Sequence, residues 1–133
     1  MEWTSALEVG YPIIDKQHRQ LVAILNQVVE NMNKPDGRAA LRDAFTKLAG
    51  YTIMHFAMED KLMAERRYPG AAEHKRIHAE LVSQVRVLES DLIAGKQMIG
   101  SKTIFFLQSW LRDHIQKTDR QLANFLNAGQ KAA

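Results

Sequence analysis

The stretch that decides the fold reads His55-Phe-Ala-Met-Glu59 and then, after the turn residues Tyr68-Pro69-Gly70, His74-Lys-Arg-Ile-His78. In each pair the two polar side chains stand four residues apart, so on an α-helix they lie on one face, about one turn from each other. Imidazole and carboxylate are ligands that a first-row transition metal such as iron accepts. The stretch therefore predicts two helices that face each other across a metal.

The second helix shows how these polar groups replace core residues. Its predicted span is residues 38–67, and its inward stripe alternates steps of four and three residues, the spacing of an amphipathic helix. Buried polar groups at such positions are costly unless they are paired or bound to an ion. The members of the stripe are Leu41, Phe45, Leu48, Thr52, His55, Glu59 and Leu62.

Similar stripes predict three further helices, in residues 15–32, 71–94 and 101–127. We expect Asp15 to cap the first of them. Breakers at Lys34-Pro35-Asp36-Gly37, Tyr68-Pro69-Gly70 and Gly95 separate the helices. We find no strand pattern. The expected fold is all-α: an up-down-up-down antiparallel four-helix bundle with an irregular N-terminal arm (residues 1–14), forming one domain over residues 1–133.

Antiparallel topology brings the ionisable core residues to one end of this bundle. They lie near the start of the first and third helices, near the end of the second, and in the second half of the fourth, which are neighbouring ends. All five histidines of the chain take part. The candidate metal ligands are His18, His55, Glu59, His74, His78, His114 and Asp119.

Asp119 needs a separate argument. It comes five residues after His114, and on a regular α-helix the two side chains would point about 140° apart. A local widening such as a π-bulge, or a reach across the core, is required to aim both at the same site. A regular helix with Asp119 facing solvent would exclude it as a ligand.

Five imidazoles and two carboxylates are too many for one tetrahedral zinc ion and suit two octahedral ions. Two such ions offer twelve coordination positions. The histidines fill five, two bridging carboxylates fill four, and an oxo or hydroxo bridge fills two. One position stays open, and it lies on the ion that has two histidines if the other has three. A small exogenous ligand can bind there, and nitrogen-rich ligation favours non-haem iron.

The composition excludes several other classes. Of 133 residues, 46% are hydrophobic and 25% charged, which is typical of a globular domain. The net charge is only +3, without a block of like charges, so we expect no nucleic-acid partner. The absence of cysteine excludes disulfides, iron–sulfur clusters and thiolate metal sites. No signal peptide or membrane-spanning stretch is visible, which favours a cytoplasmic location without membrane insertion.

These residues resemble the hemerythrin family, in its bacterial single-domain form. The resemblance covers nearly the whole chain, and the seven-residue ligand pattern is its most specific part. One departure is that many relatives carry two adjacent glutamates where this chain has Glu59-Asp60. The matching segments are Trp3, Val9-Gly10, Ile14-Asp15-Lys16-Gln17-His18, His55-Phe-Ala-Met-Glu59-Asp60, Tyr68-Pro69, His74-Lys-Arg-Ile-His78 and Trp110-Leu-Arg-Asp-His114-Ile115 with Asp119.

The resemblance implies two iron ions with a bridging oxo or hydroxo group, and reversible O₂ binding without catalysis. It assigns His74, His78 and His114 to one iron and His18 and His55 to the other. Glu59 and Asp119 would bridge the two irons. It also implies an apolar pocket around the O₂ site. Such a pocket slows proton entry and loss of peroxide, so that the ligand leaves as O₂ without autoxidation of the iron. The pocket residues would be Leu111, Phe56 and Trp110.

Two other functions remain open at this point. A di-iron oxidase, peroxidase, or nitric-oxide or iron-handling protein would also use an open coordination position, although no further buried acid or base is visible as a proton donor. A metal-free or zinc-binding structural bundle is the other alternative. The expected role is that of an O₂ carrier, a store, or a supply to oxygen-using enzymes.

Overall fold

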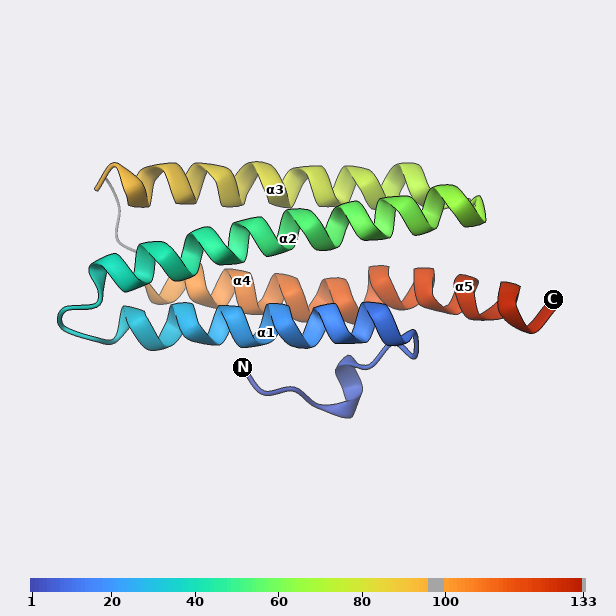
Figure 1. The fold of residues 1–133 in the computed structure, drawn as a ribbon, viewed down its shortest axis with the longest axis horizontal. Coiled ribbons are helices and arrows are strands. Elements are labelled where there is room, and N and C mark those ends of the chain that lie inside the picture. Colours follow the sequence, from blue (N-terminus) through green and yellow to red (C-terminus); the bar gives the residue numbers. More distant parts are fainter. Residues whose placement is uncertain (96–99, 133) are drawn as a thin grey trace.

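The computed structural model describes residues 1–95 and 100–132, and it contains no strand in these ranges. Figure 1 shows long helical rods that lie side by side and run alternately in opposite directions. The predicted antiparallel four-helix bundle is therefore confirmed. The rods are α1 (Pro12–Met32), α2 (Arg38–Arg66), α3 (Ala71–Ile93), and a fourth made of α4 (Ser101–Asp113), the π-helical segment η2 (His114–Asp119) and α5 (Arg120–Ala132).

The helix ends follow from local chemistry, and those of α2 and α3 fall within one residue of the prediction. Arg67 adopts the left-handed conformation (φ 55°) and ends α2, and the N–H of Tyr68 then donates to the Met63 carbonyl at 3.0 Å. At the α1–α2 turn, a Cβ on Gly37 would collide with the Asn31 carbonyl oxygen. This turn therefore requires glycine.

The N-terminal arm differs from the prediction at its junction with α1. The helix begins at Pro12, three residues earlier than predicted, because proline suits the first helical position. Asp15 is consequently inside the first turn and does not cap the helix. Its carboxylate instead accepts hydrogen bonds from the N–H groups of Val9 (2.8 Å) and Gly10 (3.1 Å), which ties the arm to α1. The arm also contains a short 3₁₀ turn, η1 (Ser5–Leu7).

The fourth rod holds the arm from the other side. The Arg120 guanidinium donates to the Ala6 carbonyl at 2.9 Å, and the Asn127 amide donates to the Gly10 carbonyl at 3.1 Å. The arm in turn buries Leu7 against the bundle. These contacts hold the arm beside the end of the bundle where the ionisable residues lie.

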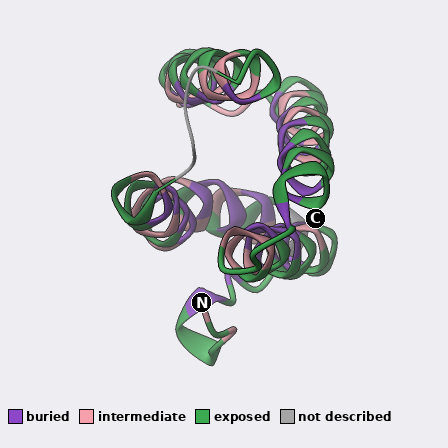
Figure 2. Ribbon diagram, turned by 90° about the vertical axis from the view of Figure 1, so that its left-hand side faces the viewer, coloured by how far each residue is buried: buried purple, intermediate pink, exposed green. Residues whose placement is uncertain are grey.

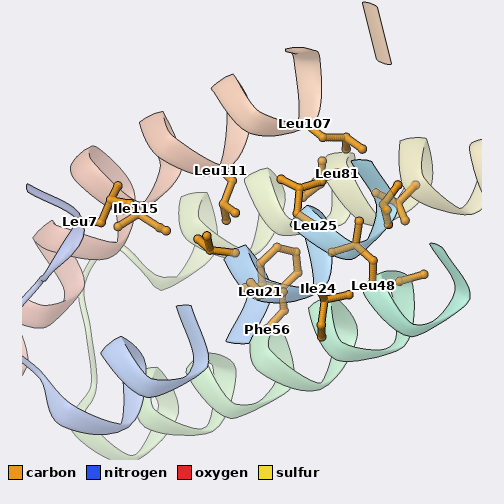
Figure 3. Close-up of a cluster of buried hydrophobic side chains, with 14 of the residues drawn as sticks. Leu7, Leu21, Ile24, Leu25, Leu48, Phe56, Leu81, Leu107, Leu111 and Ile115 are labelled. Carbon is orange, nitrogen blue, oxygen red and sulfur yellow. The ribbon is translucent and has the colours of Figure 1, made fainter. Parts of the chain in front are cut away.

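The core runs along the inside of the four rods, and the buried faces of the helices turn toward one another in the end-on view of Figure 2. Near the α1–α2 turn, the buried residues that the structure describes are all apolar. Figure 3 shows part of this packing, including Ile24, Leu25 and Leu48. The apolar end comprises Ile24, Leu25, Val28, Leu41, Phe45, Leu92 and Ile104.

None of the helices in the described ranges combines the length and apolar character that a membrane span requires.

Candidate metal centre

Each helical rod contributes to a polar layer at the opposite end of the core. α1 contributes one of its side chains, α2 and α3 two each, and the π-helical segment two. All of them are at most 5% exposed, so the structure brings every predicted ligand into the interior. They are His18, His55, Glu59, His74, His78, His114 and Asp119.

The π-helical segment solves the spacing problem of Asp119. Widening the helix over His114–Asp119 places residues five apart on one side, and Asp119 Oδ1 lies 3.0 Å from His114 Nε2. The other carboxylate oxygen lies 2.8 Å from His18 Nε2 on α1. The predicted local widening is confirmed, and Asp119 is fully buried instead of facing solvent.

The ligand atoms form two groups that share both carboxylates. Within each group, one nitrogen or oxygen from every member lies within 4.8 Å of the others. Glu59 Oε1 lies 3.0 Å from His74 Nε2, while its Oε2 lies 3.4 Å from His55 Nε2, so this carboxylate faces both groups. The larger group is Glu59, His74, His78, His114 and Asp119, and the smaller group is His18, His55, Glu59 and Asp119.

Burial controls the protonation of this layer. Removal from water lowers the pKa of His55 to about 3, of His74 to about 4 and of His78 to about 2, with nearby imidazoles lowering each further. These rings are therefore neutral near pH 7 and have a free nitrogen lone pair. Burial also raises the pKa of Glu59, and the adjacent Asp119 raises it further. Burial alone would raise the pKa of Asp119 too, but the imidazoles of His114 and His18 hold it well below its usual value.

The polar atoms of this layer fit a metal better than they fit one another. His18 Nε2 and Asp119 Oδ2 are only 2.8 Å apart, yet neither makes a hydrogen bond of acceptable geometry. His78 Nε2 and His114 Nε2 lie 3.1 Å apart. If both rings carry their hydrogen on Nδ1, both Nε2 atoms present a lone pair and can bind a cation between them. Buried polar atoms without partners are destabilising by about 1–3 kcal/mol each, so a cation between them would remove a substantial penalty. Neutral imidazole with carboxylate is a donor set suited to iron.

Aromatic rings hold two ligands of the larger group in place. The Phe56 ring stacks on His78 with centroids 3.6 Å apart and an interplanar angle of 6°. Trp110 stacks on His114 at 4.3 Å and 15°. Such packing restricts rotation of the imidazoles and keeps water away from their faces.

An apolar cavity of about 30 Å³ borders the layer. One water needs roughly 10–15 Å³, so the space has room for only a very small ligand. Its wall includes the predicted pocket residues Leu111, Phe56 and Trp110, together with both histidines of the smaller group. Figure 3 shows Leu111 and Phe56 entering the same interior space from α4 and α2.

Sequence reasoning missed two kinds of residue here. Leu21, Leu81 and Leu107 also line the cavity, and their apolar spacing alone did not separate them from ordinary core. Gln17 was missed as well: its Oε1 lies 2.7 Å from His55 Nδ1. The available signals were its place directly before His18 and its inclusion in the segment Ile14-Asp15-Lys16-Gln17-His18 that resembles the family.

A four-helix bundle with a buried imidazole and carboxylate layer defines a class of helical metal-binding proteins. Within that class, residues 9–126 match the family described as the hemerythrin HHE cation binding domain. The chain belongs to the hemerythrin family, as its sequence predicts.

Several members of the family are similar over most of the chain. The bacteriohemerythrin of Stenotrophomonas maltophilia (strain R551-3) is 32% identical over 95% of this chain and 81% of its own length. The myohemerythrin of Riftia pachyptila is 32% identical over 88% of this chain and 86% of its own length. A crystal structure of wild-type hemerythrin superimposes with a TM-score of 0.89 at 28% identity, covering 95% of this chain and 97% of that one.

Proposed function

We propose that this protein binds O₂ reversibly at a non-haem di-iron centre and acts as an O₂ carrier, store or supply. The larger group would hold one iron and the smaller group the other, with Glu59 and Asp119 bridging and an oxo or hydroxo group between the ions. Two ferrous ions would supply the electrons that O₂ draws on when it binds, and recover them when it leaves.

The observation that carries this proposal is the position of the cavity. Its wall includes both histidines of the smaller group, His18 and His55, but only one histidine of the larger group, His114, together with the shared Asp119. The smaller group also has one imidazole fewer, so an open coordination position is expected on its ion. An apolar space beside that position, with room for only a very small ligand, suits O₂.

The surrounding residues have a defined role in reversibility. Leu111, Phe56 and Trp110 restrict the water that reaches the cavity and so slow proton delivery to the bound ligand. In the described chain, no lysine or tyrosine lines this cavity that could donate a proton there. Slow protonation favours release as O₂ over irreversible oxidation, and thus a carrier over an oxidase or peroxidase.

Metal analysis with stopped-flow spectroscopy tests the proposal. Protein produced in iron-replete medium should contain two irons per chain, and its reduced form should take up one O₂ and release it when O₂ is removed. The oxidised protein is the control and should take up none. Continuous O₂ consumption with turnover would instead identify an oxidase, and absence of iron would overturn both functions.

A further inference from the structure

The outward-facing nitrogens of the buried histidines are not equivalent. When an imidazole binds metal through Nε2, its Nδ1 carries the proton and needs an acceptor. The Nδ1 atoms of His18, His74 and His78 have no hydrogen-bond partner among the residues that the structure describes. His55 differs, because its Nδ1 lies 2.7 Å from Gln17 Oε1.

The position of Gln17 follows from the packing of α1 on α2. Gln17 directly precedes His18, so its side chain lies about 100° around the helix and reaches the adjacent α2, while His18 points into the core. The side chain is half-buried, which shields the bond to His55 from competing water. Two consecutive residues of α1 thus serve the smaller group: one is a candidate ligand, and the other contacts the second candidate ligand.

The orientation of the Gln17 amide has a chemical consequence. Its Oε1 can only accept, so it stabilises the tautomer of His55 that carries hydrogen on Nδ1 and leaves Nε2 free. His55 Nε2 is the atom that faces Glu59 Oε2, at 3.4 Å. The Gln17 Nε2 atom donates toward Met54 Sδ at 3.9 Å, and a thioether can accept but not donate. This contact favours the same orientation of the amide.

Among the described residues, none makes a comparable contact with the Nδ1 atom of His74 or His78 in the larger group. The carboxylate closest to one of its outer nitrogens is Asp60, whose Oδ1 is 4.0 Å from His78 Nδ1, beyond hydrogen-bond distance. Asp60 Oδ1 is buried without a hydrogen-bond partner in the described chain, whereas Gln17 Oε1 is paired with His55. The hydrogen-bonded support is therefore directed to the smaller group.

We propose that Gln17 is a positioning residue for the ion held by the smaller group: it fixes the tautomer and orientation of His55 and thereby strengthens metal binding at that group. The inference rests on the proposed function through the assignment of His55 as a ligand. Loss of a hydrogen bond of this kind weakens metal affinity by about 10- to 100-fold. We expect a loss of that size for the weaker of the two bound ions in Gln17→Leu, with the tighter ion unchanged.

The first experiment is a competitive titration of metal-free protein with Co²⁺, followed by its ligand-field spectrum. Gln17→Leu should lose affinity in one of two binding steps, and Gln17→Glu, which keeps an acceptor, should restore it. Asp60→Asn is the matched control, because it alters a polar group facing a histidine without removing a hydrogen bond, and both steps should stay as in the unaltered protein. Equal losses in both steps, or no loss, would overturn the proposal.

A second measurement needs no metal. With ¹⁵N-labelled histidine, the NMR spectrum of the metal-free protein should show His55 protonated on Nδ1, and Gln17→Leu should shift it toward a mixture of tautomers. Unchanged tautomers in that variant would also overturn the role of Gln17. If the unaltered protein bound no Co²⁺ while its tautomer followed the prediction, the proposed function would fail and the contact between Gln17 and His55 would stand.

Discussion

The two ends of the bundle are built by the same helices with opposite chemistry. At the apolar end, Phe45, Ile24 and Val28 are fully buried among other apolar side chains, and this packing stabilises the fold without any ligand. At the polar end, five imidazoles and two carboxylates occupy the equivalent core positions, and many of their atoms lack hydrogen-bond partners. One end therefore stabilises the fold by packing alone, while the other contains buried polar atoms that a bound ion would stabilise.

Metal removal should have the largest effect on stability, and it should act through the polar end. Binding to preformed ligands contributes directly to folding, so we expect chelation to lower the stability by at least about 5 kcal/mol and Tm by at least about 15 °C. Differential scanning calorimetry of iron-loaded and metal-free protein measures the change. Refilling the metal-free protein should restore Tm, and an unchanged Tm after chelation would contradict the prediction.

A cavity at the apolar end should have the next largest effect on stability. Unlike metal removal, it should act on the apolar end and leave the polar end unchanged. Phe45→Ala should cost about 3–5 kcal/mol, because Phe45 is fully buried and the space it leaves cannot collapse completely. Iron content should remain that of the unaltered protein. Phe105→Ala is the control: this side chain is 70% exposed, so chemical denaturation should detect a change within about 0.5 kcal/mol. Loss of iron in Phe45→Ala would show that the two ends are not independent.

Acid should destabilise the metal-free polar end. His55, His74 and His78 have pKa values of about 3, 4 and 2 in the folded chain, below the ordinary value of 6.5, so below neutral pH the unfolded chain takes up more protons. Their contribution to the free energy of unfolding is therefore fully present above pH 6.5 and is lost as the pH falls below that value. Glu59 has the opposite effect on stability, because its pKa is raised in the folded chain. It takes up a proton more readily in the folded than in the unfolded chain at pH values between 4.5 and its folded pKa.

Three histidines outweigh one carboxyl group, and we expect a net loss of about 3 kcal/mol in the metal-free protein between pH 7 and pH 5. Urea denaturation at several pH values measures it. The iron-loaded protein should change less over the same range, since its imidazoles are bound. A flat profile for the metal-free protein would contradict the prediction.

The smallest expected stability change concerns Leu111, which lines the cavity beside the polar layer. Leu111→Ala should cost about 2 kcal/mol, since this side chain retains some exposure, but it should admit water to the cavity and speed oxidation of the O₂-loaded protein. The decay of its optical spectrum measures the rate. Leu92→Ala, a similar loss at the apolar end, should leave that rate unchanged, and equal rates in both variants would exclude a special role for Leu111.

The spacing of apolar and ionisable residues predicted which face of each helix is buried. The steps of three and four along residues 38–67 predicted the buried face of α2 down to His55 and Glu59, because that periodicity depends only on local helix geometry. The start of α1 was wrong by three residues, since Asp15 bonds to the arm and not to its own helix end. A side chain's choice between two nearby partners depends on tertiary contacts that spacing does not contain.

By itself the sequence determined the antiparallel order of the helices, the end at which the ionisable residues meet, and the need for a distortion near Asp119. Only the tertiary structure decided that this distortion is a six-residue π-helix, that the cavity borders the smaller group, and that Gln17 reaches His55. The physical reason is that periodicity defines which face of a helix is buried. The rotation and separation of packed helices then decide which atoms meet, at distances where a few tenths of an ångström separate a bond from a contact.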